Sequence, residues 1–353
     1  MAGAHVAGAR PVTGEPATDW RDEIPRRALV EAGLETTVPL PPGDRPLVGP
    51  GTAVMPGDLL LEHVRDPRVD EVDVRLPEGE RPLAGGRWAP VPGRRRHADR
   101  TADGELLVPV PGKATRWRLV TGDHRAPTTS AVSGIVTEVR PGAMIRLRVA
   151  GLALRGTLAA GATSRGRLEL ATDPFGELRP GGIDVGRTGS ILVVGSRIDA
   201  EALTRARAMG VRGIIVAAIA GKDLRDFQAS ERRQRAALHM PEPFGVLALD
   251  GALRRPIATP VAALLERLAG HEVALLVNPP ALVFDGSAID LPEVGPDWVR
   301  VRSGPNLGAE GRVLEPAGLW RFAGGVHLEA ARVQLDGEPS PVVLPLCDLE
   351  RFG

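Results

Sequence analysis

The sequence predicts a multidomain protein that is rich in β-structure and also contains an α/β region. Its 353 residues are enough for two or three domains of ordinary size. The 43 Gly and 33 Pro residues are spread along the chain without a period, which indicates many turns and short strands. Near residue 180 the apolar pattern changes from alternation to continuous runs separated by helical segments, which favours an α/β arrangement from that point.

Residues 1–45 are rich in Pro, Gly, Ala and charged residues, and we expect them to form an extended N-terminal arm. Within this arm, the segment near 27–33 is expected to form a short helix.

Residues 46–180 are predicted to form a β domain. Apolar Ile145, Leu147 and Val149 alternate with two arginines, so one face of this strand should be buried and the other wet. The Pro-Gly-Asp turn at 56–58 separates two apolar runs, as in a bend between strands. A polar stretch rich in Gly and Pro, at about 77–105, is interpreted as an exposed insertion.

Residues 181–280 are predicted to form a small α/β domain with a parallel sheet. Four apolar runs are short enough to be buried strands, and helical segments separate them. The expected strands are 190–196, 212–219, 244–251 and 272–279, and the expected helices are 199–210, 222–239 and 259–270. Asp199 and Thr259 are the expected N-caps of the first and third helices.

The rest of the chain is expected to be a linker followed by a small β-barrel. Residues 281–295 contain several prolines and are interpreted as the linker. Residues 296–353 contain four or five short strand-like segments, which indicates a barrel.

Composition excludes several classes of chemistry. Cys347 is the only cysteine, so an intramolecular disulfide, a cysteine zinc site and an iron–sulfur cluster are excluded. Its apolar surroundings predict a buried structural thiol. The chain has no Tyr, and Lys113 and Lys222 are its only lysines. The seven histidines are scattered without metal-ligand spacing, and no metal or cofactor site is predicted.

Charge and hydropathy indicate a cytoplasmic protein without a membrane span. Residues 1–130 carry 18 basic and 19 acidic groups, residues 131–295 carry 20 and 17, and residues 296–353 carry 6 and 8. None of these segments has the excess of basic residues expected of a protein that binds the phosphates of a nucleic acid. Sequence-specific DNA recognition is therefore not expected. No apolar run approaches the ~18 residues that a spanning helix needs.

Two segments, GPGTAVMPGDLLLEHV and APTTSAVSGIVTEVRPGAMIRLRV, together resemble the two halves of a barrel-sandwich hybrid, the fold of biotinyl and lipoyl domains. The resemblance covers about 47–64 and 126–150. It implies a barrel-sandwich-like β domain. In family members that carry a cofactor, the modified lysine lies at a hairpin tip shortly before the second half. Lys113 lies well upstream of Gly134 between Gly112 and Ala114, so the resemblance does not extend to a modified lysine.

The segment WVRVRSGPNLGAEGRVLE, residues 298–315, resembles a KOW-type module, known from bacterial elongation factors and ribosomal proteins. Gly304, Gly308 and Gly311 are expected to allow a tight loop with positive φ between two strands. Such loops in the family often touch RNA or a protein partner. The corresponding candidate contacts here are Arg300, Arg302, Asn306 and Arg312, although a solvated strand face also explains the arginines.

A search for catalytic motifs finds no phosphate-binding loop, dinucleotide fingerprint, nucleophile elbow or zinc-protease helix. In open α/β sheets, ligands bind at the carboxyl ends of the strands. That rule nominates a group of positions as ligand or anion contacts: Gly195, Ser196, Gly221, Asp223 and Asp250.

These observations predict a non-enzymatic binding or scaffold protein that acts through protein contacts, with the transcription or translation machinery as the expected setting. Two alternatives stay open at this point. One is RNA binding through the C-terminal barrel, and the other is a small-molecule site or enzyme in the α/β crevice.

Overall fold

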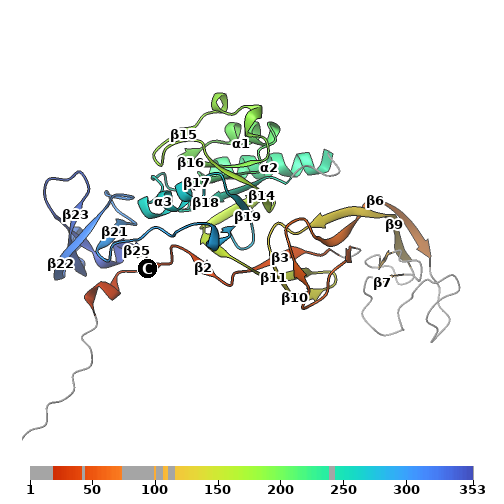
Figure 1. Ribbon diagram of the computed structural model, residues 1–353, viewed down its shortest axis with the longest axis horizontal. Coiled ribbons are helices and arrows are strands. Elements are labelled where there is room, and N and C mark those ends of the chain that lie inside the picture. The colour runs from red at the N-terminus through yellow and green to blue at the C-terminus, as the bar shows by residue number, and fades with distance from the viewer. Residues whose placement is uncertain are drawn as a thin grey trace, which may run out of the picture. The chain divides into compact units, whose positions relative to one another are not determined.

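In a computed structural model, the chain is rich in β-structure, with several sheets and few helices (Figure 1). The structure describes residues 19–41, 44–73, 99–100, 106–109, 116–237 and 243–352. The predicted insertion, apart from residues 99–100, and Lys113 lie outside this part of the chain. The chain divides into a small unit, residues 1–28 with 293–353, and a large unit, residues 29–292. No described helix has the length and apolar composition needed to cross a bilayer.

The small unit is built on a six-stranded sheet. Its order is β1 (Arg26–Arg27), β25 (Leu349–Phe352), β21 (Trp298–Val301), β22 (Glu310–Arg321), β23 (His327–Leu335) and β24 (Val342–Pro345). Alternate residues of these strands point into a shared apolar core that includes Val299, Val313 and Val333. Ile24 joins the same core from the N-terminal segment, because η1 (Trp20–Glu23) ends just before it.

Two expectations from the sequence are corrected by the structure. The segment expected to be helical near 27–33 instead supplies β1 and the strand β2 (Glu31–Ala32), since its backbone pairs with strands far along the chain. Cys347 is exposed and not buried. It lies in the single turn η6 (Leu346–Asp348), which directs Leu346 into the core and the next side chain outward.

The large unit contains a ten-stranded sheet with the order β13 (Leu158–Gly161), β18 (Gly245–Ala248), β17 (Gly213–Ala218), β16 (Ser190–Ile198), β14 (Ser164–Leu170), β19 (Glu272–Leu276), β20 (Ala281–Phe284), β12 (Leu152–Arg155) and β2, with β15 (Glu177–Leu178) paired to β16. The predicted domain boundary near residue 180 falls inside this sheet. The predicted linker begins with β20, whose four apolar residues are all buried.

The parallel arrangement expected for this sheet holds for its central strands. β14, β16, β17 and β18 pair in parallel. β19, the fourth predicted strand, instead runs antiparallel to β14. The turn after the third helix is hydrogen-bonded to Leu168 near the end of β14. The chain therefore enters β19 beside that end and runs back along β14.

Within the described residues, three α-helices cover this sheet: α1 (Ala200–Ala208), α2 (Gly221–Ala237) and α3 (Thr259–Arg267). Leu203 of α1 and Phe227 of α2 share one core with alternate residues of the central strands, and the intervening strand residues are buried too. Asp199 caps α1 as predicted, because its side chain accepts a hydrogen bond from Ala202 N. The predicted cap of α3 is one residue off, since Thr259 is already helical and Ala258 takes the cap position.

Two further sheets complete the large unit. One has the order β3 (Glu35–Pro39), β11 (Met144–Val149), β10 (Gly134–Arg140) and β5 (Ala53–Val54). The other has the order β4 (Arg45–Pro46), β6 (Leu59–Asp73), β9 (Arg116–Thr129), β8 (Leu106–Pro109) and β7 (Asp99–Arg100). In β11 the predicted alternation is confirmed, with Ile145, Leu147 and Val149 buried. Part of the predicted arm therefore forms paired strands, β3 and β4, in these two sheets.

The remaining described helices are short 3-10 turns. They are η2 (Pro180–Gly182), η3 (Val185–Arg187), η4 (Gly286–Ala288) and η5 (Ala323–Gly325).

Gly311 is predicted to control the stability of the small unit. A Cβ atom at this position would lie 2.2 Å from the backbone oxygen of Gln334 on the neighbouring strand. Because backbone cannot move aside without breaking the strand pairing, Gly311→Ala should lower the free energy of unfolding by about 1–3 kcal/mol. Gly295→Ala is the matched control, since a Cβ atom at residue 295 would meet no other atom within 4 Å. Equal urea midpoints for the two variants would contradict the prediction.

Candidate functional site

The carboxyl edge of the parallel strands holds the residues nominated from the sequence, but their polar groups are occupied. Gly195 N donates to Thr172 Oγ1 at 2.8 Å, and Ser196 N donates to Gly176 O at 2.7 Å. The Ser196 hydroxyl donates to Phe175 O at 2.8 Å. These hydrogen bonds anchor the loop at 172–176 on the end of β16. Neither amide is therefore available to an anion, contrary to the expectation for this turn.

Gly195 is required here for its small size. A Cβ atom would lie 2.2 Å from Asp173 O, so the loop packs directly on the backbone of β16. The φ angle of Gly195 is not positive. Glycine is therefore needed at this position because the loop approaches closely, and not because of the backbone conformation.

The two nominated aspartates are each paired with an arginine. Asp223, in the first turn of α2, lies 3.6 Å from an Nη atom of Arg197 at the end of β16. Asp250 is buried just after β18, and Arg255 Nε lies 3.8 Å from its carboxylate. An Nη atom of Arg255 also donates to Asp250 O at 2.5 Å. Gly221 is the exposed first residue of α2. Each of these two carboxylates therefore has a guanidinium beside it. In the described part of the chain, no group of three His, Cys, Asp or Glu residues is arranged to hold a metal ion.

The same edge exposes two apolar side chains that the sequence did not single out. Phe175 is 72% exposed and Leu253 is 65% exposed. Their loops are joined, because Arg254 pairs with Glu177 at 2.6 Å and Ile257 N donates to Pro174 O at 3.1 Å. Exposure in the structure identifies this pair, since no sequence pattern drew attention to either position.

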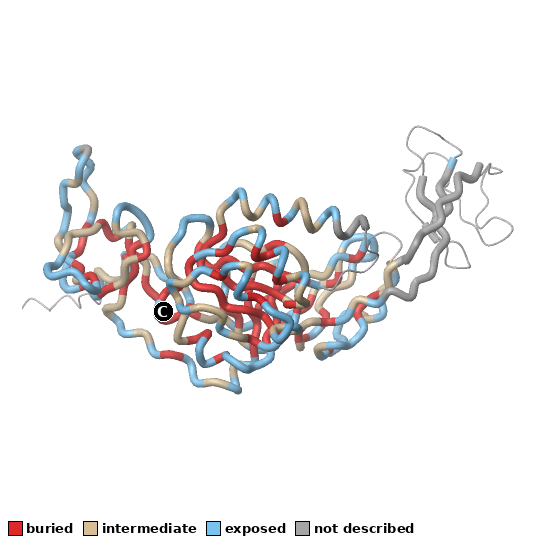
Figure 2. The backbone as a smooth tube through the Cα atoms, turned by 90° about the horizontal axis from the view of Figure 1, so that it is seen from above, coloured by how far each residue is buried: buried red, intermediate tan, exposed pale blue. Residues whose placement is uncertain are grey.

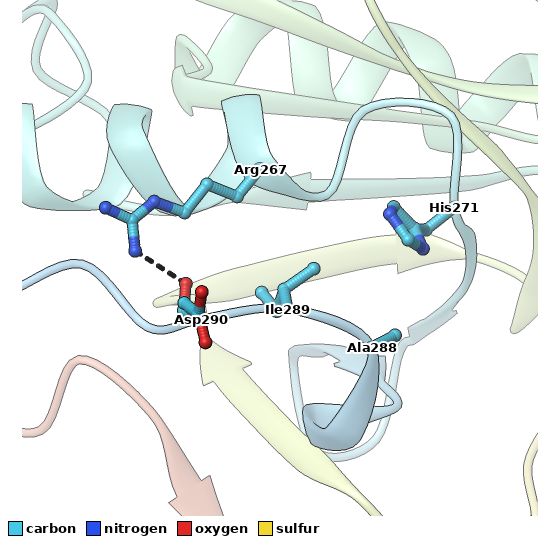
Figure 3. A pocket seen from close by; sticks show the side chains of 5 residues that line it. All are labelled: Arg267, His271, Ala288, Ile289 and Asp290. Atoms are coloured by element: carbon cyan, nitrogen blue, oxygen red, sulfur yellow. Dashed lines mark hydrogen bonds between the residues drawn. The ribbon is translucent and has the colours of Figure 1, made fainter.

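An open pocket of about 380 Å³ lies beside the C-terminal end of α3 (Figure 3). It is lined by Arg267, His271, Ala288, Ile289 and Asp290. The guanidinium of Arg267, in the last turn of α3, donates to the backbone oxygen of Asp290 at 2.6 Å, which joins the helix end to the segment after η4. Just before that segment, the hydroxyl and the backbone N–H of Ser287 both donate hydrogen bonds to the Asp285 carboxylate. These bonds lower the pKa of Asp285, and the hydroxyl has the larger effect. The lining combines one cation, one carboxylate and one imidazole, so its formal charges nearly cancel.

A hydrogen-bonded network joins the start of β4 to the strands β6 and β9 in the large unit. His63 Nδ1 lies 2.5 Å from Asp44 Oδ2, and His63 Nε2 lies 2.7 Å from Thr128 Oγ1. Asp44 immediately precedes β4, while His63 and Thr128 belong to the paired strands β6 and β9. These hydrogen bonds connect β4 and β9 to β6. The side chain of Asp44 is almost fully buried.

In the small unit, the candidate contact residues differ sharply in exposure. Arg300 has no exposed side-chain surface and lies between two carboxylates, 3.9 Å from Glu310 and 3.8 Å from Glu350. It therefore cannot reach RNA, contrary to the expectation from the KOW-type resemblance. Arg302 and Arg312 are exposed, and Asn306 is half-buried in the loop.

The loop glycines also fall into two groups. Gly304 and Gly308 have φ of 81° and 84°, as predicted for a tight loop. Gly311 lies within β22 without a positive φ, and its role is to permit the close approach of β23. The loop is closed by hydrogen bonds from Gly308 N to Val301 O and from Ala309 N to Asn306 O.

The outer part of the β22–β23 hairpin, residues 319–329, is the most exposed apolar feature of the small unit. We call it the outer ribbon. Leu319 is 65%, Val326 53% and Trp320 43% exposed. Figure 2 colours most of the hairpin as exposed or intermediate, in contrast to the buried strand residues of the sheet. Strand patterning from sequence found β22 and β23 as short strands but did not indicate that their far ends leave the sheet.

No protein-family model matches this chain, and a search of curated proteins finds no match. The function is therefore inferred from the residues themselves.

Arg300 is predicted to act in stability and not in RNA binding. Removing one member of a buried ion pair leaves carboxylates without their counter-charge, which costs about 3–5 kcal/mol. Arg300→Ala should lower the free energy of unfolding by that amount, whereas the exposed control Arg302→Ala should change it by less than about 0.5 kcal/mol. Urea denaturation of the full chain measures both. Equal stability of the two variants would show that the buried pairs do not support the fold.

Proposed function

We propose that this chain is a non-enzymatic binding or scaffold protein that acts through protein contacts. The observation that carries the proposal is the outer ribbon. Its apolar side chains, including that of Trp320, are exposed to solvent on a hydrogen-bonded two-stranded hairpin. Aromatic residues presented on a pre-ordered surface are the commonest anchors of protein interfaces. By contrast, the polar groups at the predicted α/β site are used within the fold.

The domain resemblances support the same class of function. The two segments compared with a barrel-sandwich hybrid lie against each other, because β5 pairs with β10 and Ser130 exchanges backbone hydrogen bonds with Gly57 and Asp58. We propose a barrel-sandwich-like frame here and a KOW-like barrel in the small unit. Since KOW-type modules serve transcription and translation, the partner is expected in that machinery, in the cytoplasm.

Protein contact is favoured over RNA binding by the charges of the small unit. Residues 296–353 carry 6 basic and 8 acidic groups, and one of the basic groups, Arg300, is buried between carboxylates. A phosphate-driven contact would require a surface with excess positive charge.

The proposal predicts that a protein co-purifies with the full chain from its native host. Trp320→Ser should reduce the co-purified amount at least about tenfold, because anchor residues at interfaces contribute roughly 2 kcal/mol or more. Leu170→Ser is the matched control, since Leu170 is comparably exposed on β14 of the large unit. Quantitative mass spectrometry of the eluted proteins gives the comparison. Recovery of ribonuclease-sensitive RNA with no protein partner would contradict the proposal.

A further inference from the structure

The outer ribbon has two chemically different faces. Trp320 pairs with Leu328, and Phe322 N donates to Val326 O across the turn at 2.9 Å. Because opposite residues of an antiparallel pair share a face, these four apolar side chains form one surface. The pairs Leu319–Glu329 and Arg321–His327 fall on the reverse face.

Both edges of the ribbon lack a neighbouring strand among the described residues. β21 pairs with β22 only at Glu310–Arg312, and β24 pairs with β23 only at Ala330–Val333. A two-stranded hairpin by itself is only marginally stable in water, and it gains stability when its faces are covered. The ribbon therefore projects beyond the sheet as a two-stranded element whose faces and edges can all be contacted.

The area of the ribbon argues against a second copy of this chain as the partner. Four apolar side chains make a patch on the order of 300–600 Å² at most, the size found on ordinary monomers. Two such faces pressed together bury at most about 1,200 Å², the lower limit of a stable interface. A partner that also covers the reverse face exceeds that limit, and on this face Leu319 is the most exposed of the large hydrophobic side chains of the ribbon.

We propose that the outer ribbon inserts into a cleft of a folded protein partner, which encloses both of its faces. The proposal rests on the proposed function and specifies the partner. One wall of the cleft is apolar and packs on Trp320 and Val326. The opposite wall carries a carboxylate for Arg321, which forms no ion pair within the described residues and would otherwise be desolvated without compensation.

The first test is site-specific photocrosslinking in the native host. A photoreactive phenylalanine analogue is placed at Val326 on the apolar face, at Leu319 on the reverse face, or at the control position Leu314. Leu314 is exposed on the same strand but lies nearer the sheet, before the ribbon begins. We expect positions 326 and 319 to give crosslinks to one and the same protein, and position 314 to give none.

The second test uses the protein identified in this way, with binding measured on purified full chains. Leu319→Ser and Trp320→Ser should each weaken binding about thirtyfold, the effect of losing an interface anchor. Leu314→Ser should leave affinity unchanged. Arg321→Glu should weaken binding and reduce its salt dependence. Because these side chains are exposed, unchanged thermal melting should show that each variant folds.

Several outcomes would overturn the proposal. Crosslinks from position 326 alone indicate a flat contact, crosslinks to a second copy indicate self-association, and crosslinks to lipid indicate a membrane surface. Another outcome is that a protein co-purifies in amounts that Trp320→Ser and Leu319→Ser do not change. That result would support the protein-binding function but exclude the outer ribbon as the binding surface. Absence of any protein partner would remove the proposed function as well.

Discussion

Backbone pairing between segments far apart in the chain is the constraint on which this structure depends. β1 pairs with β25, more than three hundred positions away, and Arg351 N donates to Pro25 O at 3.0 Å. β2 and β3 then enter two different sheets of the large unit. An exposed sheet edge satisfies its hydrogen bonds by recruiting any compatible backbone. A sequence with the composition of a solvated arm is therefore ordered by the strands it joins.

The need to pair buried polar groups also explains why several of the nominated side chains are engaged within the fold. Ser196, Asp250 and Arg300 are buried, and burial of a polar or charged group without a partner is unfavourable by several kcal/mol. Each of them is met by a loop carbonyl, an arginine or a carboxylate of a neighbouring element. Their chemistry is used to connect loops and strands, which leaves the exposed apolar side chains as the surface features with unused binding capacity.

The outer ribbon and the Phe175–Leu253 pair share a physical origin. In each case, apolar side chains lie where the chain has left the sheet, so no second layer covers them. The ribbon differs in having a hydrogen-bonded backbone, which holds its aromatic side chains in place before a partner arrives and lowers the entropy lost on binding. This difference makes the ribbon, and not the loop pair, the stronger basis for recognition.

Local pattern was sufficient for the elements whose environment is set by neighbours in sequence. The apolar runs of β16, β17 and β18, the alternation in β11 and the Asp199 cap follow from side-chain periodicity and from the hydrogen-bonding needs of a helix end. Tertiary structure decided what depends on distant partners: the strands formed by the N-terminal segment, the antiparallel course of β19 and the exposure of Cys347. It also decided that Arg300 is buried while Trp320 is exposed, because burial is a property of the packed neighbours and cannot be read from the residue type.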